Sequence, residues 1–261
     1  MQRILLCVSA FLWLMTACQQ SPQPGNQVLM ERKAYFVIDS YWIYLPDQFD
    51  PEKSYPLIVY LQGGDMAAGP NPRTVKNDGP AKIALLPNPH HFAKDSFIII
   101  NPHMNTGPRH KRQWGQHADE LNLILDEISA NHNIDDKRIY LTGPSKGGRG
   151  TFNILKKIPD RIAASVPIAG RIDCQSGCDA ILTEPIWIIH NQGDPLVEVD
   201  FAYNVERFFL SQNHTLKKSS NSSLDSAHQR LSILTGETHD AWTHIYQSKA
   251  FYQWLLLFQS E

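Results

Sequence analysis

The sequence predicts an α/β fold with a mostly parallel central sheet that is flanked by helices on both faces. Segments 57–61, 97–100 and 186–189 are almost continuously apolar, as expected for strands buried on both faces. Segments 119–130 and 201–210 have helical patterns and lie between such strands. Strands that alternate with helices form parallel sheets covered on both sides. The length of 261 residues suits one domain.

The other elements follow in chain order. Aromatic and β-branched residues predict early strands at 35–38 and 41–45. The segment 63–95 is rich in Pro and Gly and predicts loops with one short helix around 80–86. This segment and 101–116 are candidates for the substrate site, because loops at the carboxyl ends of parallel strands line the pocket of such a fold. Further strands are predicted at 138–142, 162–168 and 231–234, and further helices at 148–157 and 251–258.

The first residues predict an export signal. Arg3 precedes an apolar run at 4–15, which has the length of a signal-peptide core and is too short to span a membrane. The sequence Leu-Met-Thr-Ala-Cys at 14–18 resembles a bacterial lipobox, with Met15 where leucine is commoner. That resemblance implies cleavage before Cys18 and lipidation of this cysteine, with palmitate as a candidate acyl group. The alternative is an ordinary secretory signal with an incidental cysteine.

A polar, Pro-containing tether follows Cys18. The resemblance to lipoproteins implies a lipid-anchored protein of the bacterial cell envelope. Gln19, rather than Asp, favours the outer membrane of a Gram-negative cell, facing the periplasm or the exterior. Removing residues 1–17 removes only Arg3 from the charged residues, so the formal net charge changes from −2 to −3. The sequence contains no long basic run, so it does not suggest binding to nucleic acid.

Cys174 and Cys178 are a close pair with a glycine between them. In an exported protein such a pair predicts a local disulfide, and two free thiols are the alternative. A metal site needs more ligands than this pair offers, and no Cys/His cluster lies beside it in the sequence. We therefore expect no metal here.

Residues 143–147 fit the pattern G-x-S-x-G, which is typical of a nucleophilic serine on a sharp turn between a strand and a helix. The predicted strand 138–142 precedes the pattern, and the predicted helix 148–157 follows it. A serine becomes a usable nucleophile only when its hydroxyl lies beside a base and near oxyanion donors. The turn predicts this role for Ser145.

An acid and then a histidine should follow the serine along the chain. Asp194 stands at the turn beyond strand 186–189, where an acid can accept the Nδ1–H of the histidine and stabilise the imidazolium. An aspartate before a proline is also common in ordinary turns. Glu198 and Asp200 are the alternatives.

The histidine should lie in a loop after the last strand, and His239 follows the predicted strand 231–234. In this position it can take the proton of the serine and return it to the leaving group. His244 lies nearby at a helix-like position, and His228 precedes the strand. His239 is therefore the expected general base.

An oxyanion hole needs two backbone N–H groups. One is expected from Lys146, the residue after the nucleophile, and the other from the loop after strand 57–61. Glycines in that loop allow a carbonyl oxygen to approach the backbone closely. We expect Gly64 to be the donor, with Gly63 as the next choice and an ordinary Gly-Gly turn as the alternative.

Four segments carry a resemblance to the polyhydroxybutyrate-depolymerase-like, "predicted peptidase" esterases of the α/β-hydrolase superfamily. The resemblance covers roughly residues 35–258 and implies the α/β-hydrolase fold with Ser145, Asp194 and His239 as the triad. Its motifs are specific for the fold and the triad and poorly specific for the substrate. The segments are 55–64 (YPLIVYLQGG), 78–80 (DGP), 138–148 (RIYLTGPSKGG) and 236–242 (GETHDAW), with the closing 254–256 (WLL).

The chain departs from that group at two positions. The group commonly has histidine where Gln62 stands and methionine where Lys146 stands. Gln62 can still form hydrogen bonds and brace the loop. Lys146 would donate through its backbone, so its side chain either favours an anionic substrate or is simply solvated.

These expectations describe a cell-envelope serine esterase without a separate lid domain. Residues 1–17 would be the signal peptide, 18–34 the lipidated cysteine and polar tether, and 35–261 the catalytic domain. Acyl or feruloyl esters of polysaccharides are candidate substrates, and neither an organic cofactor nor a metal is needed. The alternatives are a serine peptidase and a non-catalytic envelope lipoprotein that uses the fold to bind.

Overall fold

The structure is a computed structural model of the chain. It describes residues 21–261, apart from 33–35, 65–78, 87–90, 105–112 and 175–176. The expected signal peptide and Cys18 lie outside the described residues, as do large parts of the two long loops that are candidates for the substrate site. Among the described residues, no helix is long and apolar enough to cross a membrane.

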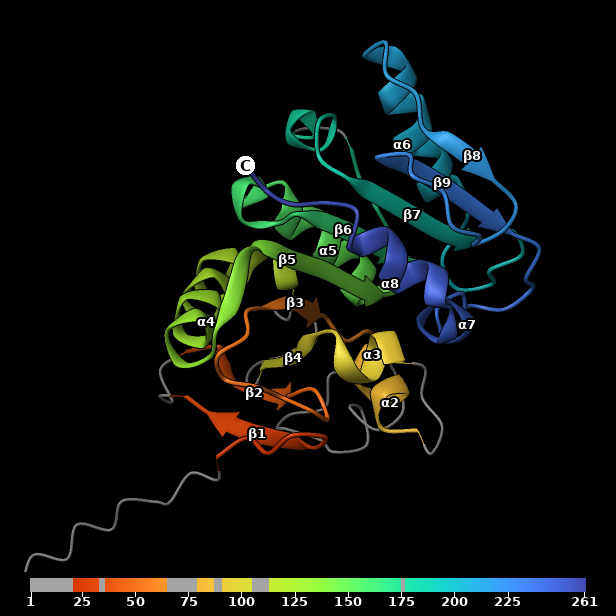
Figure 1. Cartoon of the computed structure of the whole chain (residues 1–261). Coiled ribbons are helices and arrows are strands. Elements are labelled where there is room, and N and C mark those ends of the chain that lie inside the picture. Colours follow the sequence, from red (N-terminus) through yellow and green to blue (C-terminus); the bar gives the residue numbers. More distant parts are fainter. Residues whose placement is uncertain (1–20, 33–35, 65–78, 87–90, 105–112, 175–176) are drawn as a thin grey trace, which may run out of the picture.

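The described part of the chain forms one nine-stranded sheet in the order β1-β2-β4-β3-β5-β6-β7-β9-β8 (Figure 1). Neighbouring strands from β4 to β8 along this order pair in parallel, whereas β1 and β2 form an antiparallel edge. The strands are β1 (Gln27–Glu31), β2 (Ile38–Tyr44), β3 (Tyr55–Tyr60), β4 (Ile98–Met104), β5 (Ile134–Pro144), β6 (Ala164–Ile168), β7 (Ile186–Asn191), β8 (Lys217–Ser219) and β9 (Gln229–Leu234).

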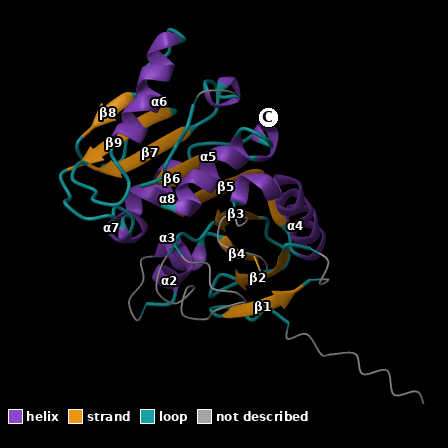
Figure 2. Ribbon diagram, turned by 180° about the vertical axis from the view of Figure 1, so that it is seen from behind, coloured by secondary structure: helices purple, strands orange, loops and turns teal. Residues whose placement is uncertain are grey.

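Helices cover both faces of the sheet, as Figures 1 and 2 show from opposite sides. Residues of α4, α5 and α6 belong to one hydrophobic cluster, and residues of α2, α7 and α8 belong to another. Leu57 and Val59 of β3 belong to the first cluster, while Ile58 and Tyr60 belong to the second. The helices are α2 (Pro80–Ala84), α3 (His91–Asp95), α4 (Ala118–Asn131), α5 (Lys146–Leu155), α6 (Asp200–Ser211), α7 (Thr243–Gln247) and α8 (Lys249–Leu255).

The N-terminal edge differs from the sequence-based expectation. The segment 18–34 is predicted as a tether, yet Gln27–Glu31 pairs with β2 over its whole length and buries Val28. The folded domain therefore begins before residue 35. The strand predicted at 41–45 corresponds to β2, which begins earlier, at Ile38. Of the strand predicted at 35–38, residues 36 and 37 lie before β2 and residue 35 lies outside the described residues. Val28 lies in the core and Met30 packs against it, so the edge strand contributes apolar side chains as well as backbone pairing.

Smaller differences lie at the ends of other elements. Helix α5 begins at Lys146, directly after the serine, two residues earlier than predicted. The short elements α3, α7 and β8 are not predicted, and the closing helix α8 covers Lys249–Leu255 rather than 251–258. The strand β5 extends from Ile134 rather than from 138.

Close backbone packing joins β3, β5 and α5. A Cβ placed on Gly147 would lie 1.8 Å from the Leu61 carbonyl oxygen, and one placed on Gly143 would lie 2.3 Å from the same atom. Both distances are far below a van der Waals contact, so only glycine allows this approach. The G-x-S-x-G spacing is therefore required by the packing of the elbow on β3.

Replacing Gly147 by alanine should destabilise the protein by about 3 kcal/mol or more, because the clash is with backbone and no rotamer relieves it. Gly64→Ala is the matched control. Gly64 has φ of +66° and open space around its Cβ position, so only the left-handed backbone is penalised, by about 1–2 kcal/mol. Urea unfolding of both variants measures the difference. Equal losses would show that the close approach is not the constraint.

Candidate active site

Ser145 lies on a strained turn between β5 and α5. Its backbone has φ of 54° and ψ of −115°, a left-handed conformation that residues other than glycine rarely adopt. Its amide donates a hydrogen bond of 2.8 Å to the carbonyl of Ile168 at the end of β6. Strain of this kind persists only where the surroundings enforce it, and it is common at functional sites. The side chain is partly exposed at the carboxyl end of the sheet.

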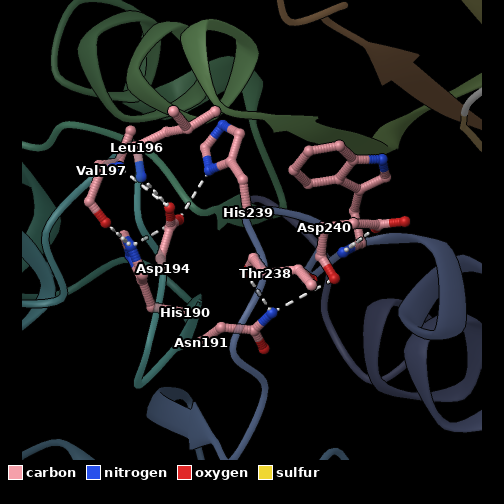
Figure 3. A network of polar contacts seen from close by, with 9 residues as sticks. His190, Asn191, Asp194, Leu196, Val197, Thr238, His239 and Asp240 are labelled. Carbon is pink, nitrogen blue, oxygen red and sulfur yellow. Dashed lines mark hydrogen bonds and ion pairs between the residues drawn. The ribbon is translucent and has the colours of Figure 1, made fainter.

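Asp194 and His239 meet across two loops of the C-terminal half. The Nδ1 atom of His239 lies 2.7 Å from Oδ2 of Asp194, and Figure 3 shows the ring directed at the carboxylate. A carboxylate only accepts, so Nδ1 carries the hydrogen. Nε2 of His239 is thereby left without this hydrogen and can act as a base.

The Asp194 carboxylate is fully buried and accepts from several donors (Figure 3). Its Oδ1 accepts from the amides of Leu196, at 2.8 Å, and Val197, at 3.0 Å. Burial alone would raise the pKa of Asp194, but the hydrogen bond from His239 and the two amides outweigh it and hold the pKa below its usual value. The carboxylate is therefore ionised at neutral pH and fixed in orientation.

His190, near the end of β7, is a second histidine that contacts the Asp194 carboxylate. Its Nε2 lies 2.9 Å from the Val197 carbonyl oxygen and 3.3 Å from Oδ2 of Asp194. The carbonyl accepts, so Nε2 carries the hydrogen. Burial lowers the pKa of His190, and the nearby carbonyl and carboxylate offset this only in part. A neutral His190 therefore holds Asp194 from the side opposite the catalytic candidate. The sequence shows only a histidine near the end of a buried strand, and this pattern does not predict the role.

Asn191 holds the loop that carries His239. Its Nδ2 donates to the carbonyl of Thr238 at 2.8 Å and to that of Asp240 at 3.3 Å (Figure 3). The Asp240 carboxylate in turn accepts from the amides of Trp242 and Thr243. The loop is fixed on both sides of His239, although nothing in the local sequence indicates this.

A cavity of about 160 Å³ brings Ser145 and His239 together with the loop after β3. The Gly63 backbone packs against the elbow, since a Cβ there would lie 2.6 Å from the Pro144 carbonyl oxygen and 3.2 Å from the Ser145 Cβ. The ring of Trp242 packs edge-on against His239 with centroids 5.2 Å apart. The lining residues are Tyr60, Gln62, Gly63, Gly64, Pro144, Ser145, His239 and Trp242.

Gln62 is buried beneath this loop. Its carbonyl oxygen accepts from Nε1 of Trp114 at 3.2 Å, and its side-chain Nε2 lies 3.4 Å from Nε2 of His103. Burial lowers the pKa of His103, which favours the neutral ring. The residue that replaces the histidine typical of the resembling group thus braces the loop through its backbone and contacts another histidine.

The alternatives considered from the sequence lie elsewhere. Glu198, Asp200, His228 and His244 are exposed, and none of them is bonded to the Asp194–His239 pair in the described part of the chain. The side chain of Lys146 is also exposed and does not line the 160 Å³ cavity.

The neighbouring cysteines are joined. Cys174 and Cys178 form a disulfide with Cα atoms 5.7 Å apart, in the segment between β6 and β7. Among the described residues, no group of three or more His, Cys, Asp or Glu side chains is placed to hold a metal ion.

Comparison with known proteins finds esterases and peptidases, the group that the sequence resembles. No family model matches the chain. Dipeptidyl-peptidase 5 of Porphyromonas gingivalis is 27% identical over 169 residues, covering 61% of this chain and 23% of the relative. A bifunctional acetylxylan esterase/xylanase of Neocallimastix patriciarum is 29% identical over 121 residues, covering 46% of this chain and 18% of the relative. The chain thus spans less than a quarter of the length of these curated relatives.

Solved structures cover the chain more fully. A thermostable esterase matches with a TM-score of 0.70 and 20% identity, over 90% of this chain and 63% of that one. The ferulic acid esterase of Anaeromyces mucronatus, solved with ferulic acid, matches with a TM-score of 0.63 and 16% identity, over 91% of this chain and 93% of that one. At such identities the likeness shows a shared fold.

In a His190→Gln variant, the free energy of unfolding should fall less steeply towards acid pH than it does in the wild type. The folded pKa of His190 is below its ordinary value of 6.5. Below that pH the unfolded chain therefore binds a proton that the folded chain does not. Stability is lost as the pH falls from there towards the folded pKa, at up to about 1.4 kcal/mol per pH unit. Urea unfolding between about pH 7 and pH 5 measures this slope.

The control for this measurement is His228→Gln, since His228 is exposed. It should keep the wild-type slope, because its side chain remains exposed in the folded protein. A His190→Gln slope equal to that of the wild type would contradict a buried, neutral His190.

Proposed function

We propose, from the α/β-hydrolase fold of the chain, that this protein is a serine hydrolase of carboxylic esters. The observation that carries the proposal is the 2.7 Å bond between His239 and a buried, ionised Asp194, with the ring in the same cavity as Ser145. A serine on a strained turn beside such a pair is suited to nucleophilic catalysis.

The reaction proceeds through an acyl-enzyme. Oγ of Ser145 attacks the ester carbonyl carbon while Nε2 of His239 takes its proton, and Asp194 stabilises the imidazolium. The tetrahedral intermediate collapses as the imidazolium returns this proton to the leaving alcohol oxygen. Water, activated by the same imidazole, then cleaves the acyl-serine bond and restores the free hydroxyl.

The negative oxygen of the intermediate needs two donors. We assign the backbone N–H of Lys146, the first residue of α5, and that of Gly64, with Gly63 as the alternative. Gly63 and Gly64 both line the cavity, and the Gly63 backbone touches the elbow. The N-terminus of α5 adds a favourable dipole for the negative oxygen.

Esters of aromatic or short acyl groups, such as feruloyl or acetyl groups on polysaccharide, are the proposed substrates. The support comes from the ferulic acid esterase of similar fold and the acetylxylan esterase/xylanase relative. The rings of Trp242 and Tyr60 in the cavity wall suit a flat or small acyl group.

A serine peptidase is the second candidate, because the dipeptidyl-peptidase 5 relative is 27% identical over 61% of this chain. The same three residues serve both reactions, and a peptidase must in addition protonate an amine leaving group. A non-catalytic envelope lipoprotein is the third, and it would leave Ser145 unreactive.

The test is hydrolysis by the purified protein of nitrophenyl acetate and methyl ferulate beside dipeptide amides, with Ser145→Ala as the matched variant. We expect ester turnover, stoichiometric labelling of Ser145 by a fluorophosphonate, and a loss of kcat on the order of a millionfold in the variant. Hydrolysis of the amides but not of the esters would favour the peptidase proposal over the esterase proposal. Unchanged turnover in Ser145→Ala would refute the assignment of the nucleophile.

Asp194→Asn should lower kcat by about ten-thousandfold, because an amide cannot hold the imidazole in the required tautomer or stabilise the imidazolium. Glu198→Gln is the matched control, four residues along the same loop and exposed, and should retain wild-type kcat. Steady-state kinetics on the best ester compares the two. Similar losses in both variants would remove Asp194 from the triad.

We also propose that Cys18 carries lipid and anchors the protein in the bacterial envelope, most simply at the outer membrane. The lipobox-like sequence supports this, and stable anchoring requires more than one acyl chain. Expression in a Gram-negative host with labelled palmitate should label the wild type in the membrane fraction and leave Cys18→Ala unlabelled. The double variant Cys174→Ala/Cys178→Ala should keep the label. Label retained in Cys18→Ala would refute the lipid site.

A further inference from the structure

A second cavity, of about 520 Å³, lies beside the elbow on the β6 side. Its walls come from α5, from the loop after β6 and from the beginning of α6. Arg149, Arg171, Asp173, Cys174 and Phe201 are among its lining residues. None of the residues that line it also lines the 160 Å³ cavity that holds His239.

The cavity is one helical turn from the nucleophile. The amide of Arg149 donates to the carbonyl of Ser145 at 3.0 Å, and four residues of α-helix rise about 6 Å. The loop after β6 packs on the same turn, since a Cβ at Gly170 would lie 2.7 Å from the Arg149 nitrogen. The elbow and the cavity walls therefore form one continuous unit.

The two arginines give this cavity a positive character. The Arg171 guanidinium lies 4.9 Å from the ring centroid of Phe201, a cation–π contact that restrains it at the cavity wall. Asp173 is the acidic residue of the lining, and it interacts electrostatically with Lys156. Within the described part of the chain, no carboxylate forms an ion pair with Arg149 or Arg171. Two guanidinium groups remain for a ligand.

A disulfide lies at the edge of the cavity. Cys174, three residues after Arg171, lines the cavity and is bonded to Cys178. The chain is therefore covalently cross-linked close to the point where Arg171 enters the cavity wall.

We propose that this cavity binds a carboxylate on the acyl part of the substrate, a deepening that rests on the proposed ester hydrolysis. The leaving oxygen must lie within reach of His239, which lines the other cavity. The acyl chain can then extend past Ser145 towards Arg149 and Arg171, whose guanidinium forks match a carboxylate. The preferred substrates are monoesters of dicarboxylic acids.

The experiment compares ethyl hydrogen succinate, glutarate and adipate with neutral ethyl esters of matched chain length, by pH-stat. The ratio of kcat/KM for the charged and neutral esters should exceed about ten for at least one length. It should fall with added salt, since screening weakens partly exposed charges. The double variant Arg149→Gln/Arg171→Gln should bring the ratio close to one. Arg207→Gln, an exposed arginine of α6 outside the lining, should keep the wild-type ratio.

A second measurement separates this inference from the proposed function. Calorimetric titration of the Ser145→Ala protein with adipate should show binding that the added arginine substitutions abolish. If no ester is hydrolysed but adipate binding depends on the arginines, ester hydrolysis fails and the anion site stands. If neutral esters are hydrolysed while the ratio stays near one, or the double variant leaves the ratio and adipate binding unchanged, the anion site is refuted.

Discussion

The approach of the Leu61 carbonyl to two glycines of the elbow is the constraint on which the rest of the site depends. A side chain at Gly143 or Gly147 would overlap that oxygen, so β3 and α5 reach this separation only with glycine at both positions. The same approach sets the Gly63 backbone against Ser145, so packing of the elbow holds the two residues together. The hydrogen bond from Ser145 to Ile168 ties the turn to β6 as well. Ser145 lines one cavity, and Arg149, one helical turn further along α5, lines the other.

The parts of the structure that could be predicted are those with local signals. The apolar runs of β3, β4 and β7 are buried on both faces, and this leaves a plain mark in the sequence. The G-x-S-x-G pattern is equally local, because its glycines are required within one turn. Asp194 and His239 could be ranked above their neighbours because each follows a strand end, and the structure bonds these two to each other.

The parts that could not be predicted depend on partners distant in sequence. His190 reads as one more polar residue at a strand end, and only the folding of the next loop brings Asp194 and Val197 onto its Nε2. Asn191 bonds to carbonyls more than forty residues away, at Thr238 and Asp240. The strand β1 is a five-residue edge strand that follows a polar stretch, and pairing with β2 places it in the sheet. The positive charge of the second cavity is likewise not visible in the sequence, because the fold brings Arg149 of α5 beside Arg171 of the loop after β6.

The left-handed backbone at Ser145 sets stability against chemistry at a single position. Glycine is the residue that this φ favours, so replacing the serine by glycine would relieve local strain of about 1–2 kcal/mol while removing the hydroxyl that we propose as the nucleophile. A descendant that no longer needed this hydroxyl would gain stability from that change and would be expected to drift towards it. Serine at this position is thus at odds with its own backbone, and the fold around it must carry enough stability to tolerate the strain.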